Sequence, residues 1–349
     1  MRSKALAVRL EHVNPGAAQL SPPLDDDPDE RQRAPVCDRQ RPEASMNSVT
    51  VIVPSYNHQA YVSECLHSIL AQSDLPAKLV VIDDGSTDDS VPIIERELAR
   101  CTCPAELIVH PVNRGLGATL NEAIARYVTT PLVTYLASDD RWLPGRIHTA
   151  ALYLTAMPDA VASYGKCLLT DAAGHRLNEA LFSTMEGMRL RPDRRVDLHG
   201  LLSFRTVPLA ASVTYRSAAV EDVGGWREHT ETEDYEMYLR LARVGEFVWT
   251  PGTHAVWRLH SGQVSKSLDR MLSVALEVQR RVMCEFGVPD LQQQHYQSCI
   301  RYAYGEHFLR AGDFRTGAHL TLQNLDGAPR SAEALLERAA RLILTAARR

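Results

Sequence analysis

The chain has 349 residues, of which 45% are hydrophobic and 23% charged, as in globular proteins with one large domain and an appendage, or with two domains. The formal net charge of −5 argues against a nucleic-acid-binding protein, which would carry a basic face. It does not exclude a nucleotide ligand, because a bound metal ion can neutralise the phosphates locally. The seven cysteines are odd in number and lack zinc-ligand spacing, so we expect reduced thiols in a cytosolic compartment. We expect no membrane span, because no apolar run reaches about 18 residues, and no secretory signal, because the N-terminus lacks a continuous apolar core.

Residues 1–45 differ in composition from the remainder of the chain. They hold six of the 19 prolines, no Phe, Trp or Tyr, and an acidic cluster at residues 25–30. Such a segment buries too little apolar surface to offset its ordering entropy, so we expect a disordered tail. Met46 directly precedes the first expected strand, and a simple hypothesis is that the protein starts there.

Short β-rich runs alternate with amphipathic stretches in the first half of the chain. Strands are expected at residues 49–53, 79–82, 107–109 and 132–136, and helices at 61–72, from an N-cap at Ser86 or Thr87 to about residue 100, and at 116–128. This alternation predicts an α/β fold with a mostly parallel central sheet and helices on both faces. Ligands of such sheets bind beyond the carboxyl ends of the strands.

The second half of the chain is mixed. We expect helices at 143–157 and 233–244, strands at 161–169, 212–215, 247–249 and 255–259, and an arginine-rich loop at 177–197. From about residue 268 the pattern is helical, so we expect one domain over 46–267 and a helical extension over 268–349. The last helix, at 335–343, is amphipathic and flanked by arginines. Packing against the domain or a partner subunit is the favoured interpretation, and peripheral contact with an anionic membrane is the alternative.

Two adjacent carboxylates, Asp139 and Asp140, follow the expected strand at 132–136. Carboxylate oxygens are the ligands of hard divalent cations, which bridge them to substrate phosphates. Aspartate is also common where strands end, so the pair taken alone is compatible with a solvated turn.

Other polar residues stand at the ends of the first two strands. Pro54, Tyr56 and Asn57 follow the first strand, where an aromatic ring can stack on a nucleobase or be an ordinary surface tyrosine. Asp83 and Asp84 follow the second strand, where they can accept from a base N–H or belong to a helix N-cap.

These motifs belong to an ordered series with which the chain resembles the family 2 glycosyltransferases. The six segments are residues 51–57, 83–88, 113–117, 137–142, 233–235 and 258–265. The resemblance covers about residues 49–265. It implies a GT-A fold and inverting transfer of a sugar from a nucleotide-diphosphate donor, with a divalent metal, Mg²⁺ or Mn²⁺, on the diphosphate.

The resemblance also implies roles for the nucleotide-binding residues. Tyr56 would stack on the base, and Asp84 or Asp83 would contact its edge, beside Pro54 and Asn57. The donor pocket would be lined by Asn113 and Gly115, with Gly117 letting the backbone approach the ligand.

The acidic residues receive roles at the reacting end of the donor. Asp139 and Asp140 match the DxD-like element, in which one carboxylate reaches the ribose or sugar and the other binds the metal. Many relatives carry a further Asp where this chain has Ala137. Asp234 matches the catalytic base that takes the proton of the acceptor hydroxyl, and Glu233 precedes it. Acids also favour helix N-termini for structural reasons alone.

Three further residues complete the expected site. His260 is the third metal-ligand candidate, and Arg258 is expected to face the diphosphate with Ser265 and Lys266. Trp226, after two glycines, is expected either to form the floor of the sugar site or to pack in the core.

The leading hypothesis is a metal-dependent inverting glycosyltransferase. It would use a UDP- or dTDP-sugar donor and a glycan or lipid-linked acceptor, in bacterial surface polysaccharide assembly, in the cytoplasm or at the cytoplasmic face of the inner membrane. The alternatives are a non-catalytic sugar-nucleotide-binding protein and a sugar nucleotidyltransferase, although residues 54–58 lack the glycine-rich loop that a triphosphate needs. A dehydrogenase is disfavoured because no Gly-x-Gly-x-x-Gly follows the first strand.

Overall fold

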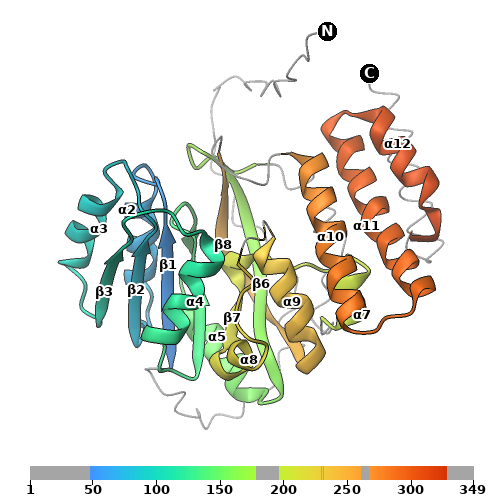
Figure 1. The fold of residues 1–349 in the computed structure, drawn as a ribbon. Coiled ribbons are helices and arrows are strands. Elements are labelled where there is room, and N and C mark those ends of the chain that lie inside the picture. Colours follow the sequence, from blue (N-terminus) through green and yellow to red (C-terminus); the bar gives the residue numbers. More distant parts are fainter. Residues whose placement is uncertain (1–47, 178–195, 229, 231, 261–266, 328–349) are drawn as a thin grey trace. The chain divides into compact units, whose positions relative to one another are not determined.

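The computed structural model describes residues 48–177, 196–228, 230, 232–260 and 267–327. All of them belong to the unit Glu43–Arg349 (Figure 1). The expected tail at 1–45, most of the arginine-rich loop, Ser265, Lys266 and the expected helix at 335–343 lie outside the described residues.

The first half of the described chain alternates between strands and helices, as the sequence predicts. Its elements are β1 (Val49–Ser55), α2 (Val62–Leu70), β2 (Lys78–Asp83), α3 (Ser90–Leu98), β3 (Ala105–Val109), α4 (Leu116–Tyr127) and β4 (Leu132–Tyr135). The strands pair in parallel in the order β3-β2-β1-β4. Every residue of β1 is buried, which explains its run of valine and isoleucine in place of an alternating pattern.

The second half adds antiparallel strands to this parallel sheet. Its elements are β5 (Arg141–Trp142), α5 (Arg146–Ala156), β6 (Ala160–Asp171), α7 (Leu198–Leu202), β7 (Thr214–Arg216), α8 (Ser217–Asp222), α9 (Glu233–Val244) and β8 (Glu246–Leu259), with a 3-10 helix at Ala210–Ser212. The complete order is β3-β2-β1-β4-β7-β6-β8-β5. The β4–β7, β7–β6 and β8–β5 pairs are antiparallel, so the sheet is mixed.

One strand replaces two expected ones. The sequence predicts separate strands at 247–249 and 255–259, whereas β8 is continuous and pairs with β6 over nearly its whole length. Gly252, with φ at +91°, lies where the β6–β8 register shifts, and it takes a conformation that glycine adopts most readily. The break in the hydrophobic pattern therefore marks an irregularity within a strand.

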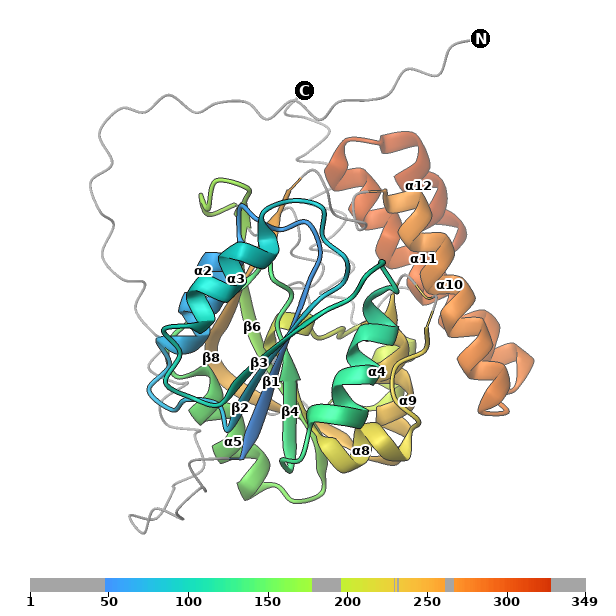
Figure 2. The same ribbon diagram turned by 60° about the vertical axis from the view of Figure 1, so that its left-hand side comes forward.

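Helices cover both faces of the sheet, as Figure 2 shows for α2 and α3 on one side and α4, α8 and α9 on the other. Successive residues of β1 alternate between the two layers. Val51 and Val53 belong to the buried cluster with α2, and Ile52 belongs to the cluster with α4 and α9. The period-two alternation of a strand thus supplies both cores from one continuous apolar run.

Three helices follow the sheet: α10 (Leu268–Glu285), α11 (Asp290–Ala311) and α12 (Phe314–Gln323), with a 3-10 helix at Leu325–Gly327. Val278 of α10 and Ile300 of α11 belong to the same buried cluster as α9. α11 and α12 approach closely at Gly305, where an added Cβ would lie 2.8 Å from the Thr321 Cγ2. None of the described helices combines the length and the apolar character needed to cross a bilayer.

Candidate active site

The carboxyl ends of β1, β2 and β4 meet at one edge of the sheet. Hydrogen bonds continue the pairing past the strand ends, because Asp84 N donates to Ser55 O and Ser138 N donates to Pro54 O. The segments that follow β1, β2 and β4 are therefore neighbours in space. This confirms that the polar motifs of the first half gather at the edge where parallel sheets bind ligands.

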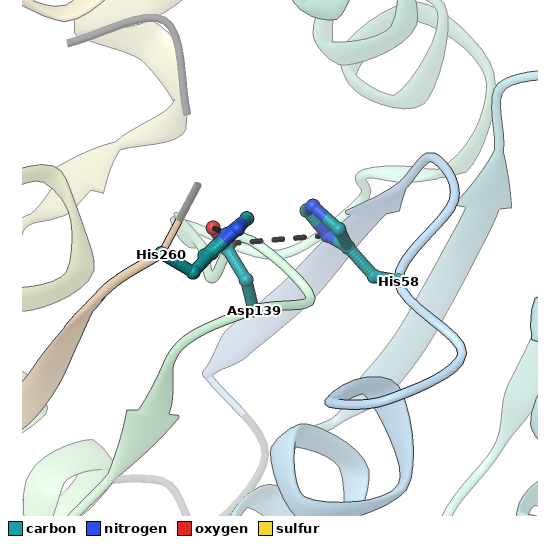
Figure 3. Close-up of side chains that lie close together, drawn as sticks. All are labelled: His58, Asp139 and His260. Carbon is teal, nitrogen blue, oxygen red and sulfur yellow. Dashed lines mark hydrogen bonds and ion pairs between the residues drawn. The ribbon is translucent and has the colours of Figure 1, made fainter. Parts of the chain in front are cut away.

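His58, Asp139 and His260 converge at this edge (Figure 3). They follow β1, β4 and β8 respectively, and each offers a ligand atom within 4.8 Å of the others. The His260 Nε2 lies 2.9 Å from the Asp139 Oδ2, and the His58 Nδ1 lies 4.0 Å from the Asp139 Oδ1. Burial lowers the pKa of His58, which favours the neutral imidazole that binds metals.

Asp140 is not part of this group, although its position after the fourth strand predicts a metal ligand. Its Oδ1 accepts a hydrogen bond from the Arg258 backbone N at 2.9 Å, and its pKa is raised by burial and by the charge of Asp139. The Asp140 carboxylate therefore joins the β4 turn to the end of β8. Among the described residues, the candidate ligand that the sequence patterns did not reveal is His58, although it stands directly after Asn57.

Arg258 braces the same turn. Its Nε donates to the Asp139 backbone O at 3.0 Å, its guanidinium pairs with Glu64, and it lies 5.0 Å over the Tyr61 ring. The side chain is 4% exposed. Instead of projecting freely toward a diphosphate, it holds the backbone that presents Asp139 and Asp140.

The loops after β1 and β2 are tied to each other. Asn57, at φ +55°, donates its backbone N to the Ser86 Oγ and accepts the Thr87 N on its Oδ1. Asp83 is fully buried and accepts from both the backbone N and the hydroxyl of Ser86. Tyr56, which directly precedes Asn57, is 44% exposed, so its ring is accessible for stacking.

The predicted N-cap of the second helix is wrong. α3 begins at Ser90 instead of near Ser86 or Thr87, and the Ser90 N donates to the Asp88 Oδ1. Ser86 and Thr87 are engaged with Asp83 and Asn57 in the loop pair, which removes them from the helix.

Asp84 holds the loop that contains Asn113 and Gly115. Its carboxylate accepts from the backbone N of Arg114 at 2.9 Å and of Gly115 at 2.8 Å, and contacts the His110 Nδ1 at 2.7 Å. The Asn113 Oδ1 also accepts from the Gly115 N, and Gly115 has φ at +88°. Asp84 is thus the buried anchor of this loop.

Two further expectations need correction. An added Cβ on Gly117 would lie 2.8 Å from the Arg227 backbone O, so this glycine allows close packing within the protein, whereas a ligand contact had been expected. Trp226 is 3% exposed and packs edge-on against Tyr135 and Tyr215, so its ring belongs to the core and not to the floor of a sugar site. The core interpretation of Trp226 is the one the structure supports.

Glu233 and Asp234 form the first turn of α9, at the predicted helix start. Burial and the negative charge of Asp234 raise the pKa of Glu233 to about 8, and burial raises the pKa of Asp234. The Tyr235 N donates to the Asp234 Oδ1 at 2.6 Å.

Tyr135, the last residue of β4, connects this acid pair with the Asp139–Asp140 turn. Its pKa is raised mainly by burial, and the charges of Glu233, Asp234 and Asp140 raise it further. The charge of Tyr215 contributes after burial and before these carboxylates, and the phenol is influenced by acids from both segments.

Comparisons with known proteins agree with this geometry. The family model described as "Glycosyl transferase family 2" matches residues 50–206. The amylovoran biosynthesis glycosyltransferase AmsE of Erwinia amylovora is 24% identical over 198 residues, which cover 56% of this chain and 70% of that protein. Three other curated relatives are matched over only 30%, 36% and 35% of their own length.

Solved structures share the fold. The mannosyltransferase PcManGT of Pyrobaculum calidifontis, in complex with GDP-Man and Mn²⁺, aligns with a TM-score of 0.59 at 18% identity, covering 86% of this chain and 82% of that one. TarS of S. aureus, residues 1–349 in complex with UDP-GlcNAc, aligns with a TM-score of 0.55 at 20% identity, covering 81% and 82%.

Proposed function

The chain belongs to glycosyltransferase family 2, and from this premise we propose that it transfers a sugar from a UDP- or dTDP-sugar to a glycan or lipid-linked acceptor in surface polysaccharide assembly, using a divalent cation. The observation that carries the proposal is the convergence of three metal-ligand candidates, His58, Asp139 and His260, beyond the carboxyl ends of the strands. AmsE is named for amylovoran biosynthesis, which supports a biosynthetic context.

The donor's diphosphate would lie at the group formed by His58, Asp139 and His260. These side chains fit a divalent cation because they supply two imidazoles and a carboxylate from three separate segments. A bound cation supplies Lewis-acid stabilisation of the departing diphosphate, so no residue has to protonate the leaving group. The Arg258 backbone N donates to the Asp140 carboxylate and the Arg258 Nε donates to the Asp139 backbone O, and these two bonds keep the ligand-bearing turn in place.

Asp234 is the base in this proposal. Inversion requires the acceptor hydroxyl to attack from the face opposite the diphosphate, and a carboxylate must take its proton. Burial raises the pKa of Asp234, and burial with the charge of Asp234 raises the pKa of Glu233 to about 8, so the two acids titrate as a pair.

The nucleotide would occupy the loops after β1 and β2. The exposed Tyr56 ring offers a stacking surface, and Pro54 and Asn57 shape the loop beside it. Asp83, Asp84, Asn113 and Gly115 act in this proposal mainly by fixing the loop backbones that border the nucleotide. PcManGT and TarS, which share the fold, bind GDP-Man and UDP-GlcNAc respectively, which supports a nucleotide-sugar donor.

A panel of UDP-, dTDP- and GDP-sugars tests the proposal. Each donor is added with Mn²⁺ or with a chelator, and both the thermal unfolding temperature and the release of nucleoside diphosphate are measured. We expect at least one donor to stabilise the protein in a metal-dependent way and to be consumed, with Asp234→Asn binding it but not consuming it. Stabilisation without consumption by the wild-type protein, in the presence of glycan acceptors, would favour a non-catalytic sugar-nucleotide-binding protein.

A further inference from the structure

We propose that His58 is a metal ligand together with Asp139 and His260, and that this nitrogen-rich set selects a transition ion such as Mn²⁺ or Co²⁺ over Mg²⁺. The inference rests on the proposed function, since the ion would serve the donor's diphosphate. Its decisive measurements need no sugar nucleotide, however, so the two can fail separately.

The separations of the candidate ligand atoms suit a single ion. Atoms bound to one metal at about 2.1 Å lie about 3.0 Å apart at right angles and about 4.2 Å apart across the ion. The distance from the Asp139 Oδ2 to the His260 Nε2 is 2.9 Å, and that from the Asp139 Oδ1 to the His58 Nδ1 is 4.0 Å. The two distances end on different oxygens of Asp139, and one atom of each residue lies within 4.8 Å of the others, so side-chain adjustments of about 1 Å would bring the three to a single ion.

The kind of donor atom decides which ion is preferred. Mg²⁺ prefers carboxylate, carbonyl and water oxygens, whereas imidazole suits later first-row ions. Two of the three candidate ligands are imidazoles, and the carboxylate that would make the site oxygen-rich, Asp140, is bonded to the Arg258 N. The two imidazoles therefore favour first-row transition ions over Mg²⁺, and among these they favour Co²⁺ more strongly than Mn²⁺.

The His58 ring is held in place before any ion arrives. Its Nδ1 lies 2.8 Å from the Ser138 Oγ, and its backbone N donates to the Ser90 Oγ at 3.0 Å. The ring stands edge-on to His260, with centroids 5.6 Å apart. Because the same Nδ1 is the candidate ligand atom, an ion bound there would replace the contact with Ser138, while the backbone contact with Ser90 keeps the loop in place. The competing explanation is that His58 only anchors its loop to Ser138.

Pulsed EPR of Mn²⁺ bound to the protein separates these explanations, because it detects coupling to imidazole nitrogen. His58→Asn keeps an amide that can hydrogen-bond Ser138 but removes the imidazole. His148→Ala, on an exposed histidine paired with Asp74, is the matched control. We expect two imidazole couplings in the wild-type protein and in His148→Ala, and one in His58→Asn.

Calorimetric titration with each metal alone supplies a second measurement. We expect His58→Asn to lower the affinity for Mn²⁺ by about 10–100-fold and the affinity for Mg²⁺ by less than about threefold. A single nitrogen coupling in the wild-type protein, or unchanged Mn²⁺ affinity and couplings in a folded His58→Asn variant, overturns the inference. If that variant does not fold, the wild-type spectrum with ¹⁵N-labelled histidine decides alone.

The outcomes also separate this inference from the proposed function. Two nitrogen couplings without consumption of any sugar nucleotide would leave the metal site standing and remove the transferase assignment. Sugar transfer by a wild-type protein whose bound Mn²⁺ couples to one nitrogen would leave the transferase assignment standing and remove His58 from the metal site.

Discussion

Replacing Asp84 by Asn tests whether this carboxylate is a structural anchor of the donor-side loop. Asp84 is 5% exposed and contacts the backbone N of Arg114 and Gly115 and the His110 Nδ1, all within 2.9 Å. An Asn amide keeps one acceptor but turns an NH₂ group toward one of these donors. Since a hydrogen bond to a charged group contributes about 1.5–3 kcal/mol, losing one or two should cost about 2–4 kcal/mol of unfolding free energy.

Urea denaturation measures this loss, and donor binding to the folded fraction should weaken with it. Asp74→Asn is the control, because Asp74 pairs with His148 at the surface, where such pairs contribute about 0–1 kcal/mol. If Asp84→Asn weakens donor binding while the free energy of unfolding changes by less than about 0.5 kcal/mol, Asp84 contacts the nucleotide and does not hold the loop.

Three further changes follow from the structure. An acid whose pKa is raised in the folded protein makes the unfolding free energy fall as the pH rises from 4.5 to about 8. Glu233→Gln removes this acid, so the fall across that window should be smaller by about 1 kcal/mol or more, as measured by urea titrations at a series of pH values. Gly117→Ala should cost about 1–3 kcal/mol, measured by thermal unfolding, because its Cβ would meet the Arg227 O at 2.8 Å. Arg258→Lys should weaken Mn²⁺ binding by about tenfold in calorimetry, because a lysine cannot reproduce the guanidinium contacts that brace Asp139.

Each of these changes has a contradicting result. Parallel pH profiles for wild type and Glu233→Gln would place the raised pKa elsewhere. An unchanged melting temperature for Gly117→Ala would mean that the helix and the facing backbone separate without cost. Unaltered Mn²⁺ affinity in Arg258→Lys would show that the turn keeps its geometry without the guanidinium.

Local patterns in the sequence were sufficient for much of the fold. The apolar runs ending at Ser55 and Tyr135 and the acids at the start of α9 depend on neighbouring residues, so strand ends and the helix start at Glu233 could be placed in advance. Gly252 was harder to interpret, because an irregularity inside β8 interrupts the apolar pattern much as a loop does.

The composition of the metal-ligand group was less accessible, because it depends on contacts across the chain. His58 and His260 lie 80 and 121 positions from their hydrogen-bond partners Ser138 and Asp139. Which of two adjacent carboxylates faces the histidines is decided by the Arg258 N, which takes Asp140. No local pattern reports such a choice.

The burial of individual side chains was equally hard to foresee. Trp226 follows two glycines, a pattern that suits a flexible loop over a substrate as well as a turn into the core. Trp226 packs against Tyr135 of β4 and Tyr215 of β7, two strands that pair in the sheet. Tyr135 lies 91 positions before Trp226 in the chain, so no local pattern indicates this contact. Asp83 likewise accepts hydrogen bonds from Ser86 within its own turn, and in the sequence this arrangement looks the same as a helix N-cap.

The most direct test of the central claim compares donor affinity and transfer rate in Asp234→Asn. Donor affinity is measured by calorimetry with Mn²⁺, and the transfer rate by the formation of glycosylated acceptor. The account predicts a donor Kd close to that of the wild-type protein and a kcat lower by about 10²–10⁴-fold, since a general base contributes that much. A variant that transfers sugar at the wild-type rate would contradict it.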